Sequence, residues 1–155
     1  MDKKKILIAD DEIVVRYTVG RILDKDYIVL EATNGEEAVE IAKGQKPDLI
    51  LMDLIMPKMD GYTACSEIKA DQATKGIPVV ILTAVGHELN KKYAMEMGAE
   101  GYVTKPINTQ ELIDVITTLL AKALQSHNIA MRTLTPQLSE DNPAQQSSMS
   151  QDRKL

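Results

Sequence analysis

The sequence predicts an α/β protein whose doubly wound, five-stranded parallel sheet is covered by helices on both faces. Short apolar runs between turn signals are typical of buried parallel strands, and four of them are spread along the chain. Stretches with helical spacing of apolar residues lie between them, so strands and helices alternate. The four runs, with the polar residues that follow them, are Ile6–Asp11, Leu49–Asp53, Val79–Thr83 and Gly101–Pro106.

The first half of the chain fits two strand-and-helix units. Apolar residues recur near helical spacing over Ile13–Asp24, and Tyr27–Leu30 is expected to form another strand, the second along the chain. Asn34 is suited to cap a helix that begins near Gly35, with Glu37 placed for a capping box.

Three further helices are expected in the second half. One begins at Gly61, and one covers about His87 to Met97 and ends at Gly98, a residue typical of helix C-termini. The last is expected from about Asn108 to Leu124. The order is therefore (βα)₅, with right-handed crossovers.

The composition changes after Leu124. Residues 125–155 hold prolines, a Gln-Gln-Ser-Ser run and scattered apolar residues, too few to offset the entropy cost of ordering. We therefore expect a folded domain over residues 1–124 and a flexible tail over 125–155. A short helical extension through His127–Leu134 is an alternative for the start of that tail.

Overall composition excludes several classes. The net charge of −5 argues against non-specific binding to nucleic acid or anionic membranes. No apolar run approaches the length of a membrane span or a signal-peptide core. The single cysteine, Cys65, excludes an internal disulfide framework and suits a reducing compartment. We expect a cytoplasmic protein.

The polar residues at the strand ends are the candidate site. In an open parallel sheet, residues just past the carboxyl ends of the strands line a shared crevice. Asp10, Asp11, Asp53, Thr83 and Lys105 are therefore expected to converge there. Three carboxylates repel one another without a cation, and carboxylate oxygens suit Mg²⁺. A hydroxyl and an ammonium beside them suit a phosphoryl group.

These residues, in this order and spacing, closely resemble the receiver domain of two-component response regulators, of the chemotaxis-regulator type. The resemblance covers residues 5–124 and rests on Asp10-Asp11, the run Met52–Gly61, Thr83-Ala84 and Lys105-Pro106. It implies a flavodoxin-like sheet of order 2-1-3-4-5. It also implies that Asp53 accepts a phosphoryl group and that Asp11, Asp53 and the backbone carbonyl of Ile55 contact a Mg²⁺ ion, with Asp10 acting on the ion mainly through a bound water.

The resemblance gives the other site residues roles as well. Lys105 is expected to pair with Asp53 and then with a phosphoryl oxygen. The peptide bond between Lys105 and Pro106 is expected to be cis. Thr83 would donate its hydroxyl to a phosphoryl oxygen, and Tyr102 would move inward as the switch residue. Taken alone, Thr83 also fits a hydroxyl that caps its loop, and Tyr102 a half-buried strand residue.

Other function classes fit less well. A haloacid-dehalogenase-like phosphatase would also use an aspartyl nucleophile and Mg²⁺. That class requires a second Asp two residues after the nucleophile, and Ile55 occupies this position here. A flavodoxin-type electron carrier would need a phosphate loop where Asp10-Asp11 stand. A DNA-binding regulator would need a further domain.

The expected function is therefore that of a stand-alone receiver, a signalling protein rather than an enzyme. Its expected partner is a histidine kinase or a histidine phosphotransferase that docks near Val14 and Val15, with no nucleic acid or membrane partner. A monomer is expected, with dimerisation on phosphorylation left open. The downstream target is open, as is the choice between an effector and a relay or adaptor.

Overall fold

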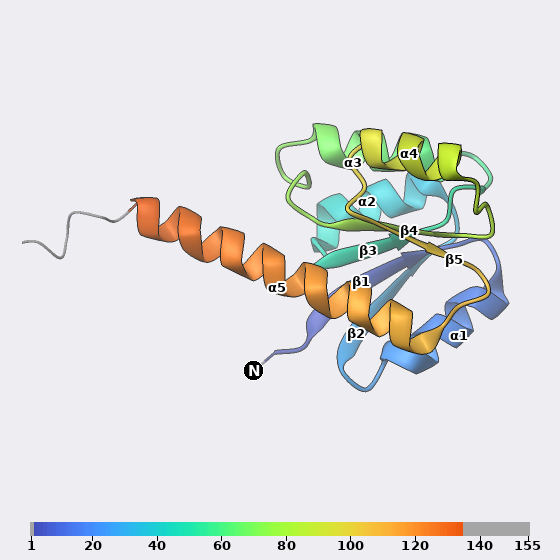
Figure 1. The fold of residues 1–155 in the computed structure, drawn as a ribbon, viewed down its shortest axis with the longest axis horizontal. Helices are drawn as coiled ribbons and strands as arrows, with labels where there is room; N and C mark the ends of the chain where they lie inside the picture. Colours follow the sequence, from blue (N-terminus) through green and yellow to red (C-terminus); the bar gives the residue numbers. More distant parts are fainter. Residues whose placement is uncertain (1, 135–155) are drawn as a thin grey trace, which may run out of the picture. The chain divides into compact units, whose positions relative to one another are not determined.

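The computed structural model describes residues 2–134. Strands and helices alternate along this part of the chain, and each strand pairs in parallel with its neighbours in the order β2-β1-β3-β4-β5 (Figure 1). The predicted (βα)₅ order and strand order are confirmed. The elements are β1 (Lys4–Ala9), α1 (Ile13–Leu23), β2 (Tyr27–Ala32), α2 (Gly35–Gln45), β3 (Leu49–Met52), α3 (Gly61–Ala70), β4 (Val79–Thr83), α4 (Glu88–Glu96), β5 (Gly101–Thr104) and α5 (Thr109–Leu134).

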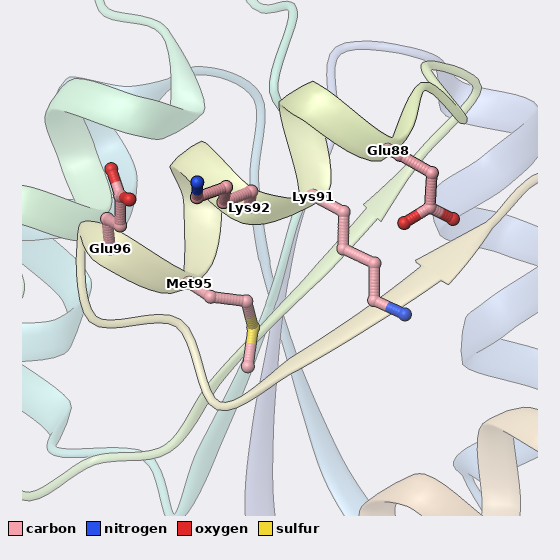
Figure 2. Close-up of a pocket in the computed structure, with 5 residues that line it drawn as sticks. All are labelled: Glu88, Lys91, Lys92, Met95 and Glu96. Carbon is pink, nitrogen blue, oxygen red and sulfur yellow. The ribbon is translucent and has the colours of Figure 1, made fainter.

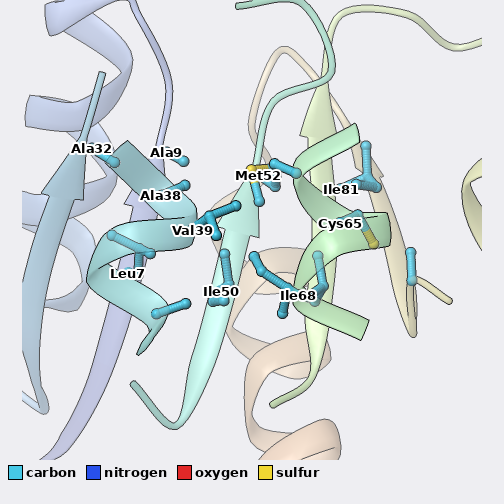
Figure 3. Packing of buried hydrophobic residues seen from close by; sticks show 14 of the residues in the cluster. Leu7, Ala9, Ala32, Ala38, Val39, Ile50, Met52, Cys65, Ile68 and Ile81 are labelled. Carbon is cyan, nitrogen blue, oxygen red and sulfur yellow. The ribbon is translucent and has the colours of Figure 1, made fainter. Parts of the chain in front are cut away.

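Helices cover both faces of the sheet. Helices α2, α3 and α4 lie on one face, and α1 and the start of α5 lie on the other (Figure 1). Strand β1 shows why the strands must be apolar throughout: Leu7 faces the first layer and Ile8 the second, and both are buried. Figure 3 shows the first layer, in which Ile50 of β3 packs near Ile68 of α3.

Polar caps fix where the helices beside the site begin. The Asn34 side chain accepts a hydrogen bond from the Glu37 backbone N–H at 2.9 Å, as predicted. The Glu37 carboxylate accepts a bond from the Thr33 hydroxyl at 3.1 Å, a contact that the capping-box pattern did not predict. Asp60, whose capping role the sequence reading missed, accepts from the Thr63 N–H at 2.8 Å and starts α3.

Helix α5 is longer than predicted. It continues to Leu134, whereas the expected helix ended at Leu124, so residues 125–134 follow the alternative of a helical extension. Half of these residues are good helix formers, none is glycine or proline, and the first proline after them is Pro136, where a helix is expected to have stopped. The rest of the predicted tail lies outside the described residues.

The chain divides into two units, Met1–Ala123 and Leu124–Leu155. The first contains the whole sheet and both apolar layers. In the second, residues 124–134 are helical, and Leu124, Ile129 and Leu134 are exposed. Across residues 2–134, every helix is too short or too polar to cross a membrane.

Candidate phosphoryl and metal site

Three carboxylates meet at the carboxyl edge of the sheet. Asp10 and Asp53 follow β1 and β3, which pair in parallel, and the Asp53 N–H donates to the Ala9 carbonyl at 2.9 Å. One carboxylate oxygen from each of Asp10, Asp11 and Asp53 lies within 4.8 Å of the others. Asp10 and Asp53 are buried, whereas Asp11 is exposed. The cluster therefore has two buried acids and one that faces solvent.

Lys105 contacts the two buried acids of this cluster. Its Nζ donates to Asp10 Oδ2 at 2.7 Å and to Asp53 Oδ2 at 3.2 Å. The expected pair with Asp53 is present, but the contact with Asp10 is shorter. Burial alone would lower the pKa of Lys105, yet the two carboxylates raise it above its ordinary value. Lys105 is therefore a fixed positive charge, and its bond to Pro106 is cis, as predicted.

The environment of Asp10 disfavours its charged form despite the contact with Lys105. Burial raises the pKa of Asp10, and the nearby Asp53 charge adds to the rise. The hydrogen bonds from Lys105 and from the Glu12 N–H act in the opposite direction but do not cancel it. A cation with a preference for oxygen ligands would relieve this repulsion. The donor set and its spacing therefore fit a Mg²⁺ ion.

A glycine allows α3 to begin directly against the chain that follows β3. The Gly61 N–H donates to the Leu54 carbonyl at 2.8 Å. A Cβ on Gly61 would lie 2.0 Å from the Asp53 carbonyl oxygen and 2.9 Å from the Leu54 Cα. Because both neighbours are backbone atoms, any side chain at this position would displace the end of β3.

Thr83 and Tyr102 are linked through the loop after β4. The buried Thr83 hydroxyl oxygen accepts a hydrogen bond from the Val85 N–H at 3.4 Å, and the Tyr102 hydroxyl donates to the Val85 carbonyl. Tyr102 is half-buried, and burial raises the pKa of its phenol. A movement of Thr83 would therefore be transmitted to Tyr102 through one shared peptide segment.

The loop residues that follow Asp53 and Thr83 have apolar side chains. The Ile55 N–H donates to Asp53 Oδ1 at 3.4 Å, while the Ile55 side chain is 68% exposed. Ala84 is exposed and small, and Val85 is half-buried. Ile55, two residues after Asp53, and Val85, two residues after Thr83, therefore offer no polar side-chain atom to a water molecule.

Two residues near the acids were missed by sequence reasoning. Arg16 Nη1 donates to the Asp10 backbone carbonyl at 2.8 Å, and its Nε donates to Glu31 at 3.1 Å. Glu12 Oε1 lies 3.7 Å from Lys105 Nζ. The sequence feature that could have indicated Arg16 is the presence of an arginine early in α1, close to the end of β1. It is weak, because arginines on helix surfaces are common.

The comparisons with known proteins agree with this geometry. Residues 6–117 match the family model described as the response regulator receiver domain. The chain belongs to this receiver family. Within it, the chain is similar to the chemotaxis protein CheY of Halobacterium salinarum, with 41% identity over 76% of this chain and 97% of that protein.

Other relatives are longer or are parts of larger proteins. The chain spans about half the length of the first curated relatives it matches: it is 39% identical to the probable transcriptional regulator ycf27 of Cyanophora paradoxa, over 79% of this chain and 50% of that protein. A similar solved structure is the receiver domain of a sensor histidine kinase from Pseudomonas aeruginosa, with a magnesium ion coordinated in its active-site cleft. Its TM-score is 0.72 at 29% identity, over 77% of this chain and 99% of that one.

Proposed function

We propose that this receiver accepts a phosphoryl group on Asp53 from the phosphohistidine of a kinase or phosphotransferase. The observation that carries the proposal is the buried Asp53 carboxylate, which lies within 4.8 Å of a carboxylate oxygen of each other acid and accepts a hydrogen bond from the Lys105 ammonium at 3.2 Å. A carboxylate oxygen of Asp53 attacks phosphorus, and the bond from phosphorus to the donor imidazole nitrogen breaks. The electron pair of that bond leaves with the imidazole.

The three clustered carboxylates of Asp10, Asp11 and Asp53 fit a Mg²⁺ ion. The Ile55 carbonyl is proposed as a further ligand. When bound, the ion would neutralise charge on the phosphoryl oxygens. The protein's own contribution is to orient the Asp53 nucleophile and to place the Lys105 ammonium beside a phosphoryl oxygen. Lys105 suits that role because it is a compact point charge already held at the site by two carboxylates.

Phosphorylation would be read out through the loop after β4. The Thr83 hydroxyl would donate its proton to a phosphoryl oxygen while its oxygen still accepts from the Val85 N–H, and this would draw the loop inward. Because the Tyr102 hydroxyl is bonded to the carbonyl of the same Val85, the ring would follow. This is a local hydrogen-bond change that biases a two-state surface.

Two surfaces are proposed to meet protein partners. Ile13, Val14 and Tyr17 on α1 are exposed beside Asp11 and would contact the phosphoryl donor. Val15, which the sequence reading placed on the same surface, is instead half-buried against the second layer, one position around the helix.

The other surface is α4, whose side chains Lys91 and Met95 border a shallow hollow of about 460 Å³ (Figure 2). Among the residues of α4, Ala94 is the only buried one, so most of the helix is available to a partner. An effector would bind a target there, and a relay or adaptor would use the α1 surface for both transfers. A cytoplasmic, non-enzymatic, monomeric receiver is part of this proposal.

The test is phosphorylation by acetyl phosphate with and without Mg²⁺. The wild type should take up one phosphoryl group only when Mg²⁺ is present, and Asp53→Asn should take up none. An exposed acid such as Asp114, changed to Asn, is the matched control and should leave uptake unchanged. Labelling of Asp53→Asn at the wild-type rate would refute the proposal. Rapid release of inorganic phosphate from phosphate esters would favour the phosphatase alternative.

A further inference from the structure

We infer that Arg16 is a positioning residue that holds the peptide joining Asp10 to Asp11, and with it the exposed metal-ligating carboxylate of Asp11. The inference deepens the proposed function and rests on it. Arg16 has no part in the roles proposed above for the acids, for Lys105 and for the switch residues. Its contacts to two other elements suggest that its role is geometric.

Asp10 is held at several of its atoms. Its N–H donates to the Ala32 carbonyl at 3.0 Å, and its carboxylate accepts from the Glu12 N–H and from Lys105. The remaining polar atom is the backbone carbonyl, which accepts from Arg16 Nη1 at 2.8 Å. Without Arg16 this carbonyl would have no partner among the hydrogen bonds found in residues 2–134.

That carbonyl belongs to the peptide unit that carries the N–H of Asp11. A peptide unit is planar, so fixing its oxygen also fixes the direction in which the chain leaves toward the Asp11 Cα. For the Asp11 side chain, no hydrogen bond or ion pair is found within the described residues. Its carboxylate is therefore placed next to Asp10 and Asp53 by its backbone alone.

Arg16 is itself held firmly enough to serve as a support. Its Nε donates to Glu31 Oε1 at 3.1 Å, and the Arg16 side chain is only 13% exposed. Glu31 lies on β2, which pairs with β1, so the guanidinium joins α1 to the sheet next to Asp10. The two contacts come from different nitrogens, Nε and Nη1, which the planar guanidinium holds at a fixed spacing. A lysine has one donor nitrogen and could not occupy both positions.

The first test is made in metal-free protein. Arg16→Met should increase amide hydrogen exchange at Glu12, whose N–H donates to Asp10 Oδ1, by about tenfold. Arg21→Met is the matched control, because Arg21 is an exposed arginine on the same helix. Unchanged exchange in Arg16→Met, or an equal rise in Arg21→Met, would overturn the inference without reference to any metal.

The second test is the affinity for Mg²⁺ measured by calorimetry. Arg16→Met should weaken binding about tenfold, the lower end of the range for residues that orient metal ligands, and Arg16→Lys should not restore it. In an Asp11→Asn background the same change should have little further effect, because the ligand that Arg16 positions is gone. Additive losses would overturn the inference. Wild-type protein that binds no Mg²⁺ would instead overturn the proposed function.

Discussion

Replacement of Gly61 by alanine should disturb the phosphoacceptor more than its small size suggests. The added Cβ would lie 2.0 Å from the Asp53 carbonyl oxygen, whereas ordinary contact begins near 3.4 Å. Since the obstructing atom is backbone, β3 or α3 has to shift by more than an ångström. A misplacement of about 1 Å at a reacting group costs roughly 100-fold in rate.

The same displacement should cost stability. Overpacking of a buried contact destabilises a protein by about 1–3 kcal/mol, and Gly61, the first residue of α3, is buried against the backbone of Asp53 and Leu54. Gly44→Ala is the matched control, because a Cβ on Gly44 of α2 meets nothing within 4 Å. There the alanine should stabilise the protein by about 0.5–1 kcal/mol.

Two measurements check this prediction. Urea unfolding followed by circular dichroism gives the free energy of unfolding, and the initial rate of phosphorylation by acetyl phosphate reports on Asp53. Gly61→Ala should lose in both and Gly44→Ala in neither. A wild-type rate of phosphorylation and unchanged stability in Gly61→Ala would show that neither property depends on the close approach of α3 to the Asp53 backbone.

Three further predictions follow from the site and the domain boundary. Ile55→Asn should speed the loss of the phosphoryl group, because an amide could orient the attacking water where the apolar side chain cannot; unchanged or slower decay would contradict this. Burial raises the pKa of Asp10 in the folded protein. The contribution of Asp10 to the free energy of unfolding is therefore greatest below the ordinary carboxyl pKa and is lost as the pH rises through the raised pKa. In Mg²⁺-free buffer Asp10→Asn should therefore raise Tm at neutral pH, with a gain that shrinks as the pH is lowered to about 4, whereas a lower Tm at neutral pH would contradict the account. Truncation after Leu124 should leave thermal stability and phosphorylation nearly unchanged, because both apolar layers lie before it, and collapse of the shortened chain would show that the boundary is misplaced.

The fold and the convergence of the acids could be predicted because both follow from the parallel sheet. Buried parallel strands must be apolar on both faces, which makes them visible in the sequence. Their carboxyl ends share one edge, so Asp10, Asp53 and Lys105 had to meet there once the strands were identified. The strand order came from the family resemblance, and the structure confirms it.

The remaining features depend on geometry that residue types do not reveal. Lys105 lies nearer Asp10 than Asp53, a matter of side-chain reach that strand ends cannot specify. Arg16 acts through a backbone carbonyl, and every residue has one, so no pattern marks its partner. The end of α5 was placed too early because the composition of residues 125–134 resembles the tail that follows more than the helix before it.

The central claim is that Asp53, and no other acid of the cluster, carries the phosphoryl group. An aspartyl phosphate is reduced by borohydride to homoserine, and peptide mass spectrometry then locates the modified residue. After Mg²⁺-dependent phosphorylation of the wild type, the account predicts homoserine at position 53 alone. Homoserine at position 10 or 11, or phosphorylated protein with none at position 53, would contradict it.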